Sequence, residues 1–549
     1  MNHQASIVTE AHPAPAIVQN TTNSSSKNIH LPAPQWFKYV FALVVLASLT
    51  YIGVQLTFDL SQVPPLSAFS FIMLGMALVI ALGFEFVNGF HDTANAVATV
   101  IYTNAMPAPV AVMWSGFFNF LGVLTASGAV AYGIIALLPV ELILHVDSGA
   151  GFAMVFALLL AAILWNLGTW FFGIPASSSH TMIGSIIGVG IMNQLLHSAT
   201  DGVSGVDMGQ VLKVAKALFF SPLIGFGLAA AAFLLLKLVM KKRQKELFAA
   251  PEGNKPPSFL VRTLLICTCT GVSFAHGSND GQKGMGLIML ILIGIVPLAY
   301  SLNKTMDPAQ VQSFAALSEK TAHILAVDHQ PAMPELQARD VLTKFIQTHK
   351  YNQQVMPAVA SLSNHLGDAV ASYGSMAKVP EKATVNLRND MYLSNASLKE
   401  LDKGNHLTQL SPAQKATVDD YRQNLDKATQ YIPTWVKVAV ALALGLGTMV
   451  GWKRIVVTVG ERIGKTHLTY GQGMSAELVA MGTIIAADKF GLPVSTTHVL
   501  NSAVAGTMTA NKSGLQWATV KSILMAWVLT LPCAMVLSAS LYWLFLQFV

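Results

Sequence analysis

The sequence predicts an all-α polytopic membrane protein that carries one water-soluble helical insert. Of its 549 residues, 53% are hydrophobic and 11% are charged, less than half the charged share of about 25% that is usual in soluble domains. Several apolar runs exceed the roughly 20 residues that a helix needs to cross a bilayer core. Residues 301–433 depart from this pattern, because they are polar and carry charges of both signs.

The apolar runs mark the segments that we expect to lie in the membrane. They span about 36–57, 68–105, 108–139, 151–172, 174–196, 209–240, 259–300, 434–452, 474–490, 491–511 and 515–548. Three of them are too long for one simple crossing and hold glycines or polar residues near their middle, so we expect broken or tilted helices there. The run 36–57 is expected to be a retained span that follows a polar, disordered tail over 1–35.

Basic residues predict the orientation of the chain, because Lys and Arg gather in cytoplasmic loops. KKRQK at 241–245 and the basic segment 453–465 should both be cytoplasmic. The insert 301–433 then lies on the outer side. Apolar residues in the insert recur with the period of a helix, as in AQVQSFAALSEKTAHILA.

Two pairs of polar motifs recur along the chain in the same order. NGFHDTAN (88–95) aligns with HGSNDGQK (276–283), and GIPASSSH (173–180) aligns with GLPVSTTH (491–498). The two offsets, 188 and 318 residues, differ by 130, which is close to the length of the insert. The second half therefore resembles the first half with a soluble segment inserted.

Five crossings are expected in each half, and an odd number places the halves upside down relative to each other. That is the inverted-repeat architecture of secondary transporters, whose sites lie at the midplane between the repeats. An ancient duplication without a shared site is the alternative. The predicted parts are a disordered tail (1–35), an extra span (36–57), a first membrane repeat (58–240), a cytoplasmic linker (241–258), the start of a second repeat (259–300), the insert (301–433) and the remainder of the second repeat (434–549).

The serine-rich motifs predict an anion site. A Gly-x-Pro break places the hydroxyl residues that follow it at a helix N-terminus, whose free backbone N–H groups bind anions. Two such ends could together hold a tetrahedral oxyanion. The hydroxyl residues concerned are Ser177, Ser178, Ser179, Thr181, Ser495, Thr496 and Thr497. Plain helix capping and small-residue helix packing are the alternatives.

The aspartates Asp92 and Asp280 occupy the same position in the other motif pair. A carboxylate at membrane depth is costly and usually functional. Because both would repel an anion, we expect them to hold a coupling cation, which prefers oxygen ligands, or to carry a proton. A structural ion pair between Asp280 and Lys283, three residues further on, is the alternative. The other candidates for this role are Asn95, Asn279, Glu85, Glu477, His91 and Lys283.

Several other classes of protein are disfavoured. The sequence holds no nucleotide-binding loop and no HExxH motif, which argues against an ATP-driven pump, and we expect no permanently bound cofactor. Its three cysteines all lie in apolar segments and suggest neither a disulfide framework nor a metal site. The net charge of +6 reflects basic clusters beside membrane spans rather than a nucleic-acid partner. A membrane enzyme for phosphoryl transfer is the alternative from another class, but an enzyme needs no inverted repeat.

With these motifs the chain resembles the inorganic phosphate transporter (Pit) family. That family carries a repeated signature close to G-A-N-D-x-A-N and, in each half, G-[LI]-P-x-S-[ST]-[ST]-H. Here the first reads GFHDTAN and GSNDGQK, and the second reads GIPASSSH and GLPVSTTH. The form of the motifs is similar to the bacterial low-affinity phosphate permease branch, and the resemblance covers both membrane halves but neither the tail nor the insert.

The resemblance implies roles for individual residues. Asp92 and Asp280 match the essential aspartates of the family, and the Ser/Thr runs match its phosphate-binding helix ends. Asn95 and Asn279 match motif asparagines, and Glu477 matches an acidic position of the second half. Two departures bear on the coupling ion: His91 and Lys283 stand where the pattern has Asn. These two departures replace amide oxygens, which could bind sodium, with titratable groups. They therefore favour protons over sodium as the coupling ion.

We therefore expect a multi-pass symporter of the bacterial inner membrane that imports inorganic phosphate. The resemblance implies proton coupling and transport of phosphate as a complex with a divalent metal, whose identity stays open. A permease for another tetrahedral oxyanion such as sulfate is the nearest alternative. The expected partners are phosphate or metal-phosphate and membrane lipid, and a homodimer is an assembly that the sequence leaves open.

Overall fold

The computed structural model describes residues 35–137, 148–197, 206, 208–240, 245–251, 253, 255–326 and 333–548. Over these ranges the regular structure is helical, apart from one isolated bridge between Gly464 and Leu515. Seven of the helices are long and apolar enough to cross a membrane, or eight if one bent pair counts as a span. The prediction of an all-α polytopic membrane protein is confirmed.

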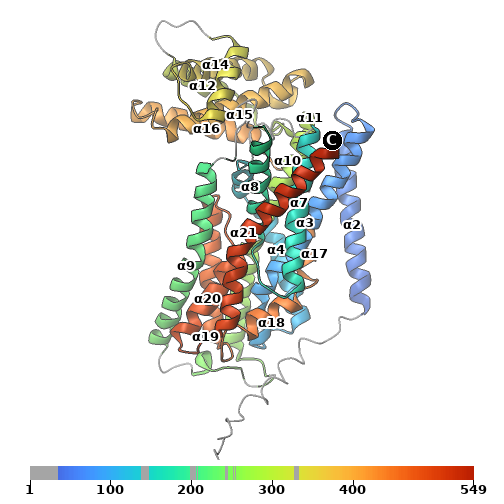
Figure 1. Cartoon of the computed structure of the whole chain (residues 1–549), viewed down its shortest axis with the longest axis vertical. Helices are drawn as coiled ribbons and strands as arrows, with labels where there is room; N and C mark the ends of the chain where they lie inside the picture. The colour runs from blue at the N-terminus through green and yellow to red at the C-terminus, as the bar shows by residue number, and fades with distance from the viewer. Residues whose placement is uncertain are drawn as a thin grey trace, which may run out of the picture.

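The membrane helices form a bundle in which segments far apart in the sequence lie side by side (Figure 1). Their bounds are α2 (Gln35–Leu60), α3 (Ala68–Tyr102), α4 (Ala108–Thr125), α5 (Ala129–Ile135), α7 (Gly149–Phe171), α8 (Ser178–His197), α9 (Met208–Val239), α10 (Phe259–Ile295), α11 (Pro297–Tyr300), α17 (Thr434–Thr448), α18 (Lys453–Glu461), α19 (Tyr470–Lys489), α20 (Thr496–Ala510) and α21 (Trp517–Phe545). Three 3₁₀ turns are also described: η1 (Lys245–Phe248), η2 (Met376–Lys378), which lies in the insert, and η3 (Leu546–Phe548).

The two longest predicted runs, 68–105 and 259–300, form helices that continue through their polar motifs without a break. Helix α3 has 35 residues and α10 has 37, so each is more than 50 Å long at about 1.5 Å per residue. Of the two alternatives expected here, broken or tilted helices, a break at the motif is not found in these two runs, and their motif glycines have another use. Gly89 lies so close to the backbone of α17, and Gly277 to the backbone of α4, that neither position has room for a Cβ. Small residues allow this close approach of membrane helices, so the glycines serve packing here.

The breaks lie elsewhere. The run 108–139 is interrupted between α4 and α5, where Gly128 has a φ of +92°. The chain also breaks between α7 and α8 and between α19 and α20, just before the serine-rich motifs. Gly173 and Gly491 stand at these two points with φ of +66° and +62°, the left-handed conformation with which glycine ends helices. A proline two residues later prevents the helix from continuing.

The polar segment after α11 folds into five helices with a hydrophobic core of its own. They are α12 (Pro308–Leu325), α13 (Glu335–Thr348), α14 (Val355–Tyr373), α15 (Glu381–Lys403) and α16 (Pro412–Thr429). Their core includes Phe314, Leu342, Leu362 and Tyr421. Capping boxes begin α12 and α16, as is usual for helices with polar N-termini. These five helices lie across one end of the membrane bundle (Figure 1).

The basic segment 453–465 lies at the other end of the bundle, where Figure 1 shows α18. Lys453 and Arg454 begin that helix. The insert and this basic segment are therefore separated by the length of the membrane helices, as the predicted orientation requires. The tail up to Pro34 and most of KKRQK lie outside the described residues, and the predicted boundaries of the seven parts stay predictions.

Candidate functional site

The N-termini of α8 and α20 meet inside the bundle. Ser177 accepts a hydrogen bond from the His180 backbone N–H at 3.2 Å, and Ser495 accepts one from the His498 N–H at 3.1 Å. These are N-cap bonds, which leave other N–H groups of the first turn free. The Ser179 hydroxyl of α8 donates to the carbonyl of Val494, just before α20, at 2.6 Å, which joins the two helix ends. Helix α8 lies toward the insert and α20 toward the opposite end (Figure 1).

Asp92 joins the two helix ends. It lies on α3 with 3% of its surface exposed, and its carboxylate accepts from Ser178 at 2.5 Å and from Thr497 at 2.6 Å. One donor comes from each helix end. His91 Nδ1 lies 3.2 Å from the same carboxylate, and its other ring nitrogen lies 3.2 Å from Thr169. The hydroxyls of Ser178 and Thr497 and the carboxylate of Asp92 are thus held together between α3, α8 and α20.

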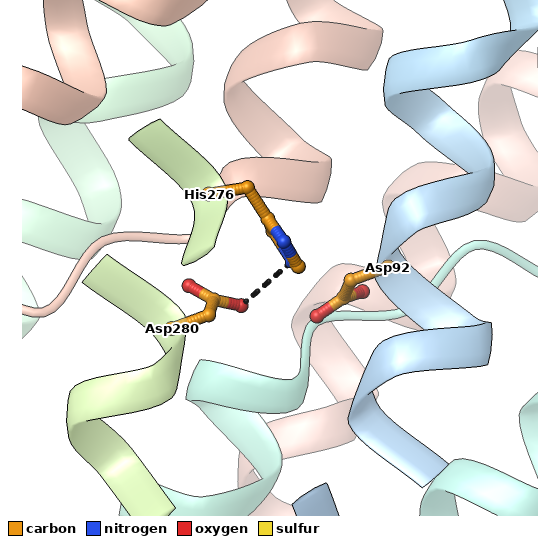
Figure 2. A group of neighbouring side chains, drawn as sticks. All are labelled: Asp92, His276 and Asp280. Atoms are coloured by element: carbon orange, nitrogen blue, oxygen red, sulfur yellow. Dashed lines mark ion pairs between the residues drawn. The ribbon is translucent and has the colours of Figure 1, made fainter. Parts of the chain in front are cut away.

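Asp280 lies across from Asp92 on α10 (Figure 2). Its carboxylate pairs with Lys283 at 2.8 Å and with His276 at 3.3 Å, and both partners are almost fully buried. Ser178 reaches this carboxylate as well, at 3.5 Å, and accepts from the Lys283 ammonium at 3.3 Å. Ser178 is therefore shared by the two aspartates. The predicted ion pair between Asp280 and Lys283 is present, and it lies inside the site.

The side chains of Asp92, His276 and Asp280 point toward one another (Figure 2). One ligand atom from each lies within 4.8 Å of the other two. Asp280 Oδ1 is buried and has no hydrogen-bond partner in the described part of the chain. Two carboxylates and an imidazole form a donor set that suits a divalent cation, so these residues could hold a metal ion as cargo or as coupling ion.

The remaining hydroxyls of the predicted anion site differ in position. Ser177, Ser178, Ser179 and Ser495 lie at or before the first helical turn, and all are buried. Thr496 is buried and its hydroxyl has no partner among the described residues. The Thr181 hydroxyl, by contrast, bonds to Asn166 at 3.0 Å and to the Ser177 carbonyl at 2.9 Å. Thr181 thus braces α8 against α7, and its place at the anion site is not supported by these contacts.

Two of the secondary candidates, Glu85 and Asn279, lie near Asp280. Glu85 is fully buried next to Gly284, one turn beyond Asp280, and its Oε1 has no hydrogen-bond partner among the residues that the structure describes. Asn279 donates to the Leu492 carbonyl at 3.2 Å, which ties α10 to the turn between α19 and α20. The Asn95 side chain lies outside the part that the structure describes.

Glu477 is separate from the aspartate pair. It accepts hydrogen bonds from Thr99 and, at 2.5 Å, from Thr268, which lie on α3 and α10 well before or after the aspartates. Its carboxylate is fully buried between three helices. The structure therefore places Glu477 in a second polar cluster of the membrane bundle.

Sequence reasoning missed several residues that support the site. The Asn119 Oδ1 accepts a hydrogen bond from His276 Nδ1 at 2.7 Å, and Thr169 orients His91. Asp488 accepts from Ser278 at 2.8 Å and from Gln282, which lie two residues either side of Asp280 and so on the other face of α10, where they fix the helix that carries Asp280. Asn119 carried a readable signal, a polar residue in the middle of an apolar run. Asp488 carried none, because it stands at the end of a run, where charged residues are common.

The charges around the site are of both signs. Two carboxylates face one ammonium, and the positive ends of two helix dipoles point at the same place. A cation bound by the aspartates would release Ser178 and Thr497 from Asp92. Those hydroxyls and the free N–H groups could then donate to an oxyanion. The geometry can therefore bind a cation and an anion side by side.

Comparison with known proteins identifies the family. Residues 88–538 match the family model described as "Phosphate transporter family". The low-affinity inorganic phosphate transporters PitA and PitB of Escherichia coli (strain K12) are 42% and 41% identical to the chain, over 87% and 88% of its length and 97% and 99% of theirs. A probable low-affinity inorganic phosphate transporter of Bacillus subtilis (strain 168) is 27% identical over 85% of the chain and 96% of the relative.

A solved structure titled "The sodium-dependent phosphate transporter" is also similar, with 19% identity and a TM-score of 0.46, over 87% of this chain and all of that one. The two Escherichia coli relatives carry transporter names, in line with the expectation that the chain is not an enzyme. The resemblance read from four short motifs is confirmed. The chain belongs to the phosphate transporter family.

Proposed function

We propose that the chain is a secondary active symporter that imports inorganic phosphate across the bacterial inner membrane. One observation carries this: the hydroxyl-rich N-termini of α8 and α20 converge on the buried carboxylates Asp92 and Asp280. The family and the names of its relatives supply the substrate. The hydroxyls and free N–H groups supply the donors that four phosphate oxygens require.

The aspartates act as the cation side of the site. Phosphate at neutral pH carries between one and two negative charges, and two bare carboxylates beside it would repel it strongly at membrane depth. A divalent metal held by Asp92, Asp280 and His276 offsets that repulsion. Phosphate then travels as a metal-phosphate complex, which is the form that carries least net charge through the bundle.

Protons are the proposed coupling ions. His91 bonds to Asp92, while Lys283 pairs with Asp280. Each carboxylate therefore has a titratable neighbour within hydrogen-bond reach, which is the requirement for passing a proton. A sodium site would instead require additional neutral oxygens, which His91 and Lys283 do not supply.

Alternating access is the proposed transport cycle. Helices α8 and α20 approach the site from opposite ends of the bundle (Figure 1), and each follows a helix break with the same Gly-x-Pro motif. Two related elements that enter from opposite sides are what an inverted repeat provides. Rocking of one half against the other would open the site to each side in turn.

Uptake of labelled phosphate by purified protein in lipid vesicles tests this function. We expect accumulation that depends on an imposed proton gradient, does not need sodium, and increases when Mg²⁺ is supplied. Asp92→Asn and Asp280→Asn should each lower coupled uptake by at least about 100-fold, since each loss removes a charge that the cycle requires. Asp420→Asn, at an exposed position of the insert, is the matched control and should transport normally.

The same assay separates the alternatives. Sulfate that competes as well as unlabelled phosphate would replace the proposed substrate with a general oxyanion. Uptake that follows a sodium gradient and ignores protons would contradict the proposed coupling. Full accumulation by either site aspartate variant would remove that residue from the mechanism.

A further inference from the structure

A large cavity lies between the insert and the membrane bundle. Its volume is about 690 Å³, and its walls come from α15 and α16 of the insert and from α5, α9 and the end of α19 in the bundle. Figure 1 shows these insert helices directly above the bundle. Tyr392 of α15 packs against the hydrophobic cores on both sides of the junction, so the insert is anchored where the cavity forms.

The cavity is strongly basic. Six of its lining side chains are Lys or Arg and two are acidic. Three of the basic groups have carboxylate neighbours: Lys403 pairs with Glu400, Arg422 lies near Asp402 and Asp419, and Lys399 interacts with Asp426. The other three are Lys213, Arg388 and Lys489.

No carboxylate pairs with Lys213, Arg388 or Lys489 among the described residues. The Arg388 guanidinium donates to Asn389 at 3.1 Å and lies 5.6 Å from the centre of the Tyr392 ring, neither of which neutralises its charge. Burial lowers the pKa of Arg388, which reflects the cost of holding an unpaired charge in this wall. A guanidinium that is partly desolvated and unpaired gains most when an oxyanion arrives.

One wall of the cavity is joined to the candidate site by a short stretch of chain. Gly491 lines the cavity and begins the turn between α19 and α20. Within that turn the Leu492 carbonyl accepts from Asn279 and the Val494 carbonyl accepts from Ser179. Ser495 caps α20 directly afterwards. Four residues of chain therefore separate the cavity wall from the helix end at which the anion is proposed to bind.

We propose that this cavity is a vestibule in which the insert concentrates phosphate before it enters the transport site. The ligand is a free tetrahedral oxyanion with one or two negative charges, held loosely by Lys213, Arg388 and Lys489. A cleft lined by one sign of charge raises the local concentration and the association rate of its substrate by roughly 10- to 1000-fold. The inference rests on the proposed function and assigns a role to the insert, which the membrane motifs do not explain.

The test is a triple variant, Lys213→Gln, Arg388→Gln and Lys489→Gln, reconstituted in vesicles of neutral phosphatidylcholine. Protease access to the insert identifies the outward-facing fraction. Initial uptake is measured at phosphate well below KM, from about 0.01 M to 0.15 M ionic strength, where the screening length falls from roughly 30 Å to 8 Å. We expect the variant to be about tenfold slower at low salt, to approach the wild type at high salt, and to keep its Vmax.

The matched control removes three positive charges from the insert away from the cavity: Lys320→Gln, Lys344→Gln and Lys382→Gln, all exposed. It should keep the salt dependence of the wild type. Equal loss in both triple variants would assign the effect to overall charge, and a uniform loss at every ionic strength with a lowered Tm would assign the residues to packing. Either result overturns the vestibule.

Two further outcomes are decisive. A triple variant that matches the wild type at all salt concentrations contradicts the vestibule while leaving phosphate transport intact, whereas absence of uptake by the wild type contradicts the proposed function itself. A difference that appears only when anionic lipid is included would make the cavity a headgroup site and overturn the proposal, since neutral vesicles offer no anionic headgroup to fill it.

Discussion

At the scale of single residues, the site depends on shared donors. Ser178 bonds to Asp92 and lies within reach of Asp280 and Lys283, so it links all three charged groups. Lys283 is fully buried and is the only ammonium among the described contacts of either aspartate. A buried charge whose partner is removed is strongly destabilising, because it remains desolvated without compensation. The ion pair therefore contributes to both the fold and the site.

Lys283→Gln should destabilise the protein by about 3–5 kcal/mol, since Asp280 would lose its ion pair while staying buried. The double variant Asp280→Asn with Lys283→Gln should recover most of that loss, because no buried charge is left uncompensated at this pair. Thermal unfolding in detergent measures both effects. A double variant no more stable than Lys283→Gln alone would contradict the ion-pair account, and neither variant is expected to transport.

At the scale of elements, glycine decides how the helices pack. Gly89 and Gly277 occupy equivalent motif positions, and each admits the backbone of another helix. Gly173 and Gly491 instead end helices, with a positive φ at each. The same residue type thus has two separate roles in the two motif pairs. The difference comes from the neighbouring sequence, since a proline stands two residues after each glycine of the second pair and none follows closely after the first.

Gly89→Ala should lower the thermal stability markedly, because a Cβ there meets the backbone of α17. Overpacking of this kind costs typically 1–3 kcal/mol. Gly83→Ala on the same helix is the matched control, since nothing lies within 4 Å of its added Cβ, and it should be neutral or slightly stabilising through helix propensity. Equal Tm values for the two variants would show that α3 and α17 do not approach closely at Gly89.

At the scale of the whole molecule, the insert and the basic segment lie at opposite ends of the bundle (Figure 1). The excess of Lys and Arg in segment 453–465 predicts that this end is cytoplasmic. The insert and its vestibule then face outward. This orientation is what a role in gathering external phosphate requires.

Cysteine labelling tests the orientation. Lys382→Cys lies on the exposed face of the insert and Lys453→Cys at the exposed start of α18. A membrane-impermeant maleimide should label the first in intact spheroplasts and the second only after permeabilisation. The parent protein controls for its three native cysteines. The reverse pattern would invert the topology and remove the vestibule from the outer face.

Much of the fold was predictable from local pattern. Apolar length identified the seven long apolar helices among the described residues, because the bilayer demands about 20 apolar residues per crossing, whereas the expected spans 174–196, 474–490 and 491–511 are not among those seven. Repetition of two motifs identified Asp92, Asp280 and the two serine-rich helix ends. The helical insert followed from its polar composition and periodicity. All of these are properties of short segments, which a sequence carries directly.

Other features depended on contacts between distant segments. The continuity of α3 and α10 came from neighbouring helices that fill the space beside their glycines. The separation of Glu477 from the aspartates and the contribution of Asn119 arose from how α4, α10 and α19 pack. The basic cavity brings together residues from helices of the insert and of the bundle that lie far apart in the sequence and share no motif. Local patterns in the sequence specify which residues are buried. The hydrogen-bond partners of a buried polar group are set instead by the packing of the whole bundle, because such a group must be hydrogen-bonded and its partners come from other segments of the chain.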